Sequence, residues 1–427
     1  MTQPGYFELS PTDRSLAILD GTSPVTFHAI WDLIGHIDHK SLGSAWHALT
    51  RLHPILTCQT NVVVDSEWRP GPHPAEITFI SGDSGVDEAT SSESTAHLNP
   101  TAGPIVRLTA ITRPDGYRMV LAAHHAAFDG AASVQLIDDL RRIYLARCAG
   151  RPESSAPDLS PRTVKAALQQ YGISLTVRRR LITQAFDRWR KLPTSDHVDP
   201  FPGDIAAANG HVSIDLGPAL NSLEEKRRRN NWPMDAVLVG LLERAWNEVF
   251  GTTPDGAGVW LVSSNLRPNL GLKGGIGNLV GVEAITMRQP AGRSLVDLIE
   301  EAAAEIAVTR LDFPGVGAEL MARSWAWTPP TVLNMGVEAM IRAGKQRRYT
   351  RILSNLGRLT DSLTDWGEAR LEGLKYLGPM TDGPYCLFVV MTHAGSSSLT
   401  VRTSAGWFTD EHARRLKTAI NRSCRLD

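Results

Sequence analysis

The segment at residues 117–146 constrains the fold of this chain more than any other. It reads YRMVLAAHHAAFDGAASVQLIDDLRRIYLA, an apolar run that leads into two histidines, an Asp-Gly pair and a stretch with helical spacing. Asp115-Gly116, just before it, is turn chemistry that joins this run to the apolar residues 104–112 and predicts a β-hairpin. Polar residues between a strand and a helix often line functional sites in α/β folds.

The two histidines and the Asp-Gly pair suit acid–base chemistry. Adjacent residues of a strand point to opposite faces, so one of His124 and His125 can face a cavity while the other packs inward. A neutral histidine can remove a proton from an amine or a hydroxyl at physiological pH. Asp129 could anchor the turn by pairing with an arginine, and Gly130 allows unusual backbone angles. The alternative is two ordinary core histidines followed by a plain turn.

The rest of the chain alternates between strand-like and helix-like segments. In the first half, a strand at 25–38 precedes a helix that Asp38 caps and Pro54 ends, and the polar residues 81–100 predict an exposed loop with some helix toward its end. In the second half we expect helices at 177–192, 217–230, 231–250, 293–311 and 409–424, the last capped by Thr409, and strands at 211–217, 258–268, 350–359, 384–395 and 398–408.

The length of the chain indicates more than one core. A chain of 427 residues exceeds what a single core usually supports, and residues 150–162 have linker-like composition. We therefore expect two mixed α/β lobes, residues 1–175 and residues 176–427, the second including the basic helix that follows the linker.

Composition excludes several function classes. A net charge of −1 argues against general affinity for nucleic acid or acidic membranes. The four cysteines, Cys58, Cys148, Cys386 and Cys424, are far apart, so we expect no zinc site and no disulfide framework, which fits a reducing cytoplasm. The N-terminus lacks the pattern of a signal peptide, and no apolar run approaches the roughly 18 residues of a membrane span.

Residues 124–130 carry a family resemblance. Their pattern, HHxxxDG, resembles the condensation domains of nonribosomal peptide synthetases and is shared with chloramphenicol-acetyltransferase-like enzymes, plant BAHD acyltransferases and polyketide-associated acyltransferases. Residues 263–281, SSNLRPNLGLKGGIGNLVG, look like the family's NLRP…GN segment, and weaker matches at 48–58, 233–246 and 353–359 extend the resemblance over about residues 5–425. The DFGWG motif of the BAHD enzymes has no clear counterpart.

The resemblance implies a fold and roles for the motif residues. The fold would be two chloramphenicol-acetyltransferase-like lobes, each a mixed sheet with flanking helices, that meet in a V as a pseudo-dimer. His125 would face a tunnel between the lobes as the general base, and His124 would be structural. Asp129, next to Gly130, would form a buried salt bridge with Arg267 of the other lobe.

Two further polar segments have open interpretations. Ser354 and Asn355, in a strand-like run, are candidates for tunnel-lining groups that donate hydrogen bonds to an oxyanion, or they belong to a structural turn. Gly274, Gly275 and Gly277 have no Lys-Ser/Thr after them, so we interpret them as a bend between the lobes rather than a phosphate loop.

The implied activity is acyl transfer from a thioester to an amine or a hydroxyl. We expect a free-standing, monomeric enzyme of secondary metabolism with no metal and no permanent cofactor. Its donor would be an acyl-phosphopantetheine thioester on coenzyme A or on an acyl or peptidyl carrier protein, and its acceptor a small amine or alcohol. The basic segments 178–191, 226–229 and 345–351 are either solvated faces or places that receive the phosphate or the carrier. The alternative function is a non-catalytic protein of condensation fold that binds a carrier or another partner. A Ser-His-Asp hydrolase fits less well because no GxSxG motif is present.

Overall fold

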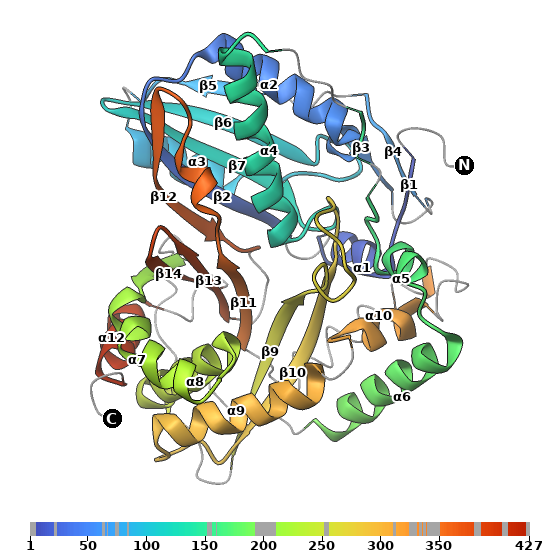
Figure 1. The fold of residues 1–427 in the computed structure, drawn as a ribbon, viewed down its shortest axis with the longest axis vertical. Helices are drawn as coiled ribbons and strands as arrows, with labels where there is room; N and C mark the ends of the chain where they lie inside the picture. Colours follow the sequence, from blue (N-terminus) through green and yellow to red (C-terminus); the bar gives the residue numbers. More distant parts are fainter. Residues whose placement is uncertain are drawn as a thin grey trace.

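A mixed five-stranded sheet organises the first lobe (Figure 1). The structure is a computed structural model that describes residues 6–20, 24–61, 65, 67–72, 77–82, 85–151, 156–158, 160–192, 211–251, 256–310, 313–323, 331–332, 335, 339, 351–379, 386–403 and 409–423. The strand order is β12-β2-β7-β6-β5, from β2 (Thr26–Gly35), β5 (Ile77–Ile80), β6 (Val106–Arg113), β7 (Gly116–His124) and β12 (Ala369–Leu377). The predicted hairpin is confirmed, since β6 and β7 pair antiparallel up to Arg113 and Gly116.

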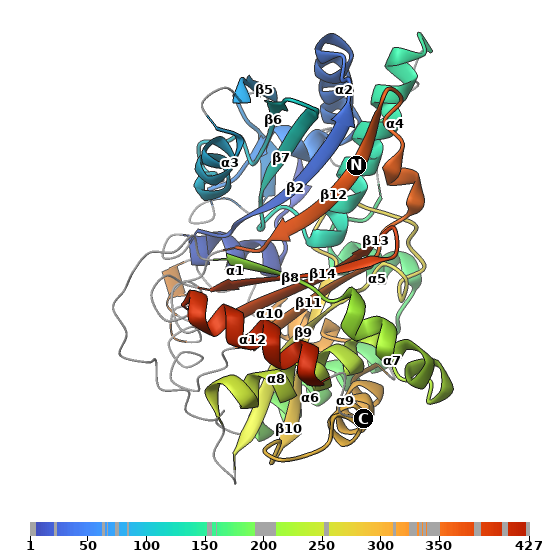
Figure 2. The ribbon, with the colours of Figure 1, turned by 90° about the vertical axis from the view of Figure 1, so that its left-hand side faces the viewer.

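Helices cover both faces of this sheet. On one face α2 (His39–Leu52) and α4 (Gly130–Cys148) bury their apolar sides, and on the other lies α3 (Val86–Thr95), as Figure 2 shows. The backbone N–H of Ser41 donates to Asp38 Oδ1 over 2.7 Å, so the predicted cap of α2 is confirmed. The prediction of an exposed loop at residues 81–100 was wrong for the middle of that segment, because α3 occupies it and buries Thr90 and Ser94.

A smaller group of elements lies at the edge of the first lobe. The short strands β1 (Phe7–Glu8), β3 (Cys58–Gln59) and β4 (Glu67–Pro70) form a three-stranded sheet. The helices α1 (Pro11–Asp20) and α5 (Val164–Tyr171) and the 3₁₀ turn η1 (Pro54–Thr57) accompany them.

The second lobe is built on a mixed six-stranded sheet. Its order is β10-β9-β11-β13-β14-β8, from β8 (His211–Asp215), β9 (Ala257–Asn265), β10 (Val280–Arg288), β11 (Arg351–Arg358), β13 (Cys386–His393) and β14 (Ser396–Thr403). The core packs against α7 (Gly217–Arg229), α8 (Met234–Phe250), α9 (Leu295–Arg310) and α12 (Asp410–Ser423), whereas α6 (Leu175–Lys191) and α10 (Val316–Arg323) pack on each other beside β10. The predicted architecture of two α/β lobes with mixed sheets is therefore confirmed.

One strand crosses between the lobes. β12 follows the 3₁₀ turn η3 (Asp361–Thr364) and pairs antiparallel with β2 of the first lobe, from Ala369 opposite Gly35 to Leu377 opposite His28. Sequence analysis did not assign β12, β10 or α10. The predicted boundary between residues 175 and 176 falls at the first residue of α6. β12 follows this boundary in the chain but belongs to the sheet of the first lobe. In the part of the chain that the structure describes, no helix is long and apolar enough to cross a membrane.

Candidate active site

The His124–Gly130 segment forms a tight turn between β7 and α4. β7 ends at His124, and the backbone N–H of Ala127 donates to the His124 carbonyl oxygen over 3.0 Å. Asp129 is the N-cap of α4, because its Oδ1 accepts from the backbone N–H of Ala132 over 2.8 Å. The helix cap thus holds the Asp129 side chain in place independently of its contacts with the other lobe.

A buried ion pair joins this turn to the second lobe. Arg267, which follows β9, donates from Nη1 to Asp129 Oδ2 over 2.9 Å, and both side chains are about 95% buried, with exposed fractions of 6% and 5%. The backbone N–H of Leu279 donates to the same oxygen over 2.8 Å. The structure therefore places Asp129 and Arg267 in the contact that the resemblance implies.

The remaining donors of Arg267 are also satisfied. Nε and Nη2 donate to the Gly275 carbonyl over 3.1 and 2.8 Å, Nη2 donates to the Gly277 carbonyl over 3.1 Å, and Nη1 also reaches Asn265 Oδ1 over 3.2 Å. All five N–H groups of this guanidinium thus have acceptors, which offsets much of the cost of burying its charge.

The glycine-rich segment is the bend that makes these carbonyls available. Gly275 has a φ of +128°, a conformation that favours glycine, and a Cβ at Gly277 would lie 2.3 Å from the Arg162 carbonyl oxygen. The Gly277 carbonyl also accepts from the backbone N–H of Asp129 over 3.3 Å. These glycines therefore bring the backbone of the second lobe against the turn, as the interpretation of a bend between lobes requires.

Asn278 is a positioning residue that sequence analysis did not single out. Its Nδ2 lies 2.9 Å from the His125 carbonyl oxygen, 2.8 Å from the Ala126 carbonyl oxygen and 2.9 Å from Asp13 Oδ1 on α1. Burial raises the pKa of the Asp13 carboxyl, and nearby Arg162 and the hydrogen bond from Asn278 oppose that shift. The Gly-Asn pair at 277–278 was the signal in the sequence, but its partners lie 153, 152 and 265 residues away along the chain.

His124 points inward. Its side chain is fully buried, Nδ1 accepts from the backbone N–H of Ala126 over 3.2 Å, and Nε2 lies 3.3 Å from Asp20 Oδ1 at the end of α1. Because Nδ1 is an acceptor, the neutral ring carries its proton on Nε2, toward the carboxylate. This arrangement agrees with the structural role assigned to His124.

His125 has the opposite character. Its backbone N–H donates to the Val25 carbonyl over 3.0 Å, its ring packs edge-on against Phe27 with 5.5 Å between centroids, and the residue is partly exposed. Among the described residues, no hydrogen-bond partner meets its buried Nδ1. Burial lowers the pKa of His125, although the nearby backbone and the negative charge of Asp129 oppose the shift. The ring is therefore neutral at pH 7 and able to accept a proton.

Gly130 allows a second contact with the other lobe. A Cβ at this position would lie 2.5 Å from Cδ2 of Leu356, which projects from β11. One turn further along α4, Ser133 Oγ donates to the Gly130 carbonyl over 2.6 Å and lies 2.7 Å from the Tyr376 hydroxyl of β12. Because the serine proton is already used, the tyrosine donates, and burial raises the pKa of the Tyr376 hydroxyl, which keeps it protonated.

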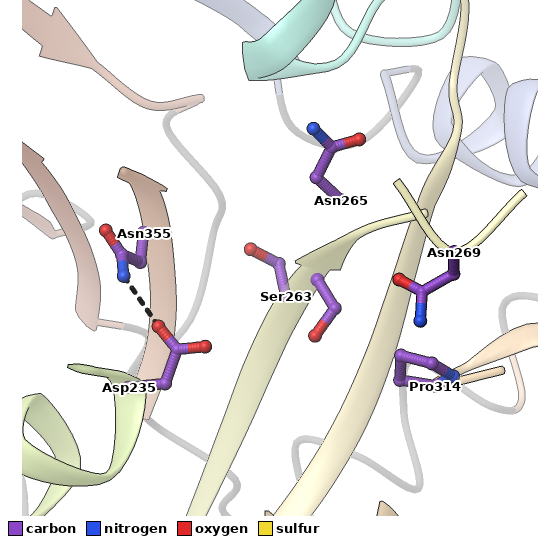
Figure 3. A pocket seen from close by; sticks show the side chains of 7 residues that line it. Asp235, Ser263, Asn265, Asn269, Pro314 and Asn355 are labelled. Atoms are coloured by element: carbon purple, nitrogen blue, oxygen red, sulfur yellow. Dashed lines mark hydrogen bonds between the residues drawn. The ribbon is translucent and has the colours of Figure 1, made fainter. Parts of the chain in front are cut away.

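A polar cavity of about 310 Å³ is lined by residues of the second lobe, and Figure 3 shows it from close by. It is lined by Pro314 and by six polar residues, namely Asp235, Ser263, Ser264, Asn265, Asn269 and Asn355. Asn355 Nδ2 donates to Asp235 Oδ1 over 2.6 Å, and Asn355 Oδ1 accepts from the backbone N–H of Gly357 over 2.9 Å. Of the two predicted tunnel residues, Asn355 thus lines the cavity and Ser354, which pairs in register with Ser263, does not. His125 is not among the lining residues either.

The basic segments have different surroundings. In α7, Arg227 and Arg228 bond Glu224 and Arg229 bonds Glu225, so these cations pair within their own helix. Residues 345–350 lie outside the described residues. Arg351 corrects the expectation of a solvated face, because it is 97% buried, bonds Glu243 over 2.7 Å and stacks over Trp260. Among the described residues, no group of three potential ligands could hold a metal ion.

Comparison with known proteins places the fold. No protein-family model matches the chain. The phthiocerol/phthiodiolone dimycocerosyl transferases of Mycobacterium tuberculosis and Mycobacterium bovis are 28% identical over 145 residues, which cover 33% of this chain and 34% of the relative. The Mycobacterium leprae transferase is 27% identical over 147 residues with the same coverage. The chain therefore spans about a third of the length of the curated relatives it matches.

Solved structures match over nearly the whole chain. Polyketide synthase associated protein 5 from Mycobacterium tuberculosis is 16% identical, with a TM-score of 0.68 and 97% of each chain covered. The first condensation domain of the calcium-dependent antibiotic synthetase is 14% identical, with a TM-score of 0.70, 100% of this chain and 97% of that chain covered. The epimerization domain of the third module of tyrocidine synthetase B is 15% identical, with a TM-score of 0.65 and coverages of 99% and 96%. The chain has the two-lobed fold of the condensation domains, as its HHxxxDG and NLRP…GN segments imply.

Proposed function

We propose that this protein is an acyltransferase that moves an acyl group from a thioester to a small acceptor. The donor would be carried on the phosphopantetheine of coenzyme A or of a carrier protein, in the cytoplasm and in secondary metabolism. The observation that carries the proposal is the turn at residues 124–130, which holds a neutral, partly exposed histidine where the two lobes meet. The similarity to dimycocerosyl transferases and the condensation-domain fold support it.

The residues have separate roles in this reaction. The acceptor oxygen or nitrogen attacks the thioester carbonyl carbon while His125 takes its proton, which gives an oxyanion and an imidazolium. The C–S bond then breaks, the carbonyl re-forms, and the imidazolium returns the proton to the leaving thiolate, so His125 is neutral again. Asp129 and Arg267 keep the turn in place without touching the reacting atoms.

The oxyanion needs a hydrogen-bond donor, for which Ser354 and Asn355 are the candidates. Asn355 Nδ2 carries two N–H groups, of which one donates to Asp235, so Ser354 and Asn355 both stay candidates.

The acceptor is proposed to react through a hydroxyl. The relatives are named as transferases to phthiocerol and phthiodiolone, and both names are those of alcohols. We therefore propose ester formation before amide formation, and the test uses both alcohol and amine acceptors.

The test compares two histidine variants. His125→Ala should fold normally and transfer acyl groups roughly 10²–10⁴ times more slowly, which is the usual contribution of a general base. His47→Ala is the matched control, because His47 is exposed on α2 and is expected to leave the rate unchanged. Product formation is measured by mass spectrometry from both coenzyme A-bound and carrier-bound donors. Near-wild-type turnover of His125→Ala would exclude base catalysis, and a wild-type protein that binds a carrier but transfers nothing would favour a non-catalytic role.

A further inference from the structure

The middle of the turn is held by side chains that lie outside it. The carbonyl oxygens of His125 and Ala126 accept from Asn278 Nδ2 over 2.9 and 2.8 Å. The next carbonyl oxygen, that of Ala127, accepts from Arg162 Nη2 over 3.1 Å. Ala126 and Ala127 are fully buried, and a buried carbonyl needs a donor from the protein because water does not reach it. Three successive carbonyls thus depend on two side chains that are distant in the sequence.

Arg162 connects the turn to the second lobe. Its Nε donates to the Ile276 carbonyl while its Nη2 donates to the Ala127 carbonyl, so one guanidinium bonds the turn and the glycine-rich segment together. The guanidinium also lies over the ring of Phe7, with 4.8 Å between Cζ and the ring centroid. The planar fork of an arginine suits two carbonyls and an aromatic face at once, whereas a lysine ammonium is a point charge.

The backbone that carries Arg162 is fixed as well. A Cβ at Gly277 would lie 2.3 Å from the Arg162 carbonyl oxygen, and Thr163 pairs with Asn278 in a parallel β-bridge. Thr163 then caps α5, because its Oγ1 accepts from the backbone N–H of Ala166 over 3.2 Å. Arg162 therefore projects from an ordered backbone, which lowers the entropic cost of its contact with the turn.

A buried carboxyl on α1 interacts with both donors to the turn. Asn278 Nδ2 lies 2.9 Å from Asp13 Oδ1, and Asp13 also accepts from the backbone N–H of Ser10 over 3.2 Å. The indole N–H of Trp68 donates to Asp13 over 3.2 Å. Burial lowers the pKa of Arg162 to about 10, and the charge of Asp13 opposes that shift, so the guanidinium stays charged at pH 7.

We propose that Arg162 is a positioning residue for the general base, because its guanidinium fixes the backbone from which the His125 ring projects. This inference rests on the proposed function, which assigns the base to His125. Ala127 lies only two residues after His125, so a displaced Ala127 carbonyl moves the base relative to the acceptor. A misplacement of about 1 Å can cost on the order of 10²-fold in rate.

The pKa of His125 reports on the same backbone. Burial lowers this pKa most, a charge on His124 also lowers it, and the backbone groups of His125 and Phe128 and the charge of Asp129 raise it. A loosened turn admits water to the ring and removes part of the largest effect. The pKa of His125 should therefore rise toward the ordinary value of about 6.5 when the turn is loosened.

The test replaces the fork and keeps the charge. Arg162→Lys retains a cation at residue 162, so its direct electrostatic effect on His125 is kept while the fixed geometry is lost. We expect kcat to fall by roughly tenfold to a hundredfold with KM unchanged, measured with an acyl-coenzyme A and an alcohol that the wild type converts. NMR titration of isotope-labelled histidine, assigned with His125→Ala, should show the rise in the pKa of His125 without any substrate.

Arg402→Lys is the matched control. Arg402, on β14, also donates to two backbone carbonyls, those of Gly378 and Ser94, and burial lowers its pKa to about 10 as well. Because these acceptors lie outside the turn, Arg402→Lys should keep the kcat and the His125 pKa of the wild type. Phe7→Leu is a milder second variant at a partly exposed position, and it should raise the pKa of His125 by less than Arg162→Lys does.

The outcomes also separate this inference from the proposed function. If the wild type transfers nothing, the function fails, whereas the pKa of His125 in Arg162→Lys still decides whether Arg162 positions the ring. If Arg162→Lys does not fold, Phe7→Leu decides. An unchanged or lowered pKa of His125 in the deciding variant, an equal change in Arg402→Lys, or a loss of activity in Arg162→Lys that appears in KM alone would overturn the inference.

Discussion

Removal of the Asp129 charge is the most direct test of how the turn is held. Asp129→Asn keeps an oxygen that can accept from the Ala132 N–H but leaves Arg267 without its anion in a site where both side chains are nearly inaccessible. Stranding a buried charge typically costs about 3–5 kcal/mol of unfolding free energy. Because the Gly275 and Gly277 carbonyls still accept from the guanidinium, we expect the lower end, about 3 kcal/mol. Asp129→Ala should cost about 1 kcal/mol more, since the helix cap is lost as well.

The assay is urea unfolding of each variant, followed by tryptophan fluorescence. The control is Glu225→Ala, which breaks the Arg229–Glu225 pair, whose side chains are 71% and 84% exposed, and should change little because exposed pairs contribute little. A double variant, Asp129→Asn with Arg267→Met, should recover part of the loss, because the stranded charge is gone. The reasoning is refuted if Asp129→Asn unfolds at the same urea concentration as the Glu225→Ala control.

Three further expectations follow from the same geometry. Burial lowers the pKa of His125, and the neutral ring is the base. The acyl-transfer rate should therefore stay constant down to pH 6.5 and decline only at lower pH. A pH–rate profile whose acid limb lies above pH 6.5 would contradict this. Gly130→Ala should lower the unfolding free energy by about 1–3 kcal/mol through its overlap with Leu356, and thermal unfolding should show a smaller cost in a Leu356→Ala background. Burial beside Arg402 lowers the pKa of His28 to about 3, so the unfolded chain binds a proton at His28 before the folded chain does. As the pH falls from 6.5 to 3, the free energy of unfolding should therefore fall by about 1.4 kcal/mol per pH unit. Acid unfolding curves of His28→Leu should show a smaller dependence on pH.

The local part of the site could be predicted from the sequence. The strand, the turn and the opposite orientations of His124 and His125 all depend on residues within a few positions of one another. The pairing with Arg267 came from the resemblance, because 138 residues separate the partners and no pattern near either of them specifies the other. Asn278 shows the same limit, since its three acceptors lie on α1 and on the turn, far from the glycines that precede it.

The missed strands differ in what the sequence offered. Residues 369–377, ARLEGLKYL, alternate between buried Ala369 and Leu371 and exposed Arg370 and Glu372, so a strand could have been assigned from period-two spacing. Its partner could not, because an alternating strand fits any open sheet edge of suitable length. The choice of β2 depends on the packed position of both lobes, which is a property of the tertiary structure.

That choice has a consequence for the turn. β12 brings Tyr376 from the C-terminal part of the chain to Ser133 on α4, while β11 brings Leu356 to Gly130 and the segment after β9 brings Arg267 to Asp129. Three separate stretches of the second half thus contact the turn and the first residues of α4. If the chain were divided at residue 175, β2 would lose its partner strand over His28–Gly35, and Asp129 would lose its only charged partner in the described contacts. The geometry at His125 therefore depends on the assembled pair of lobes rather than on the segment that contains the motif.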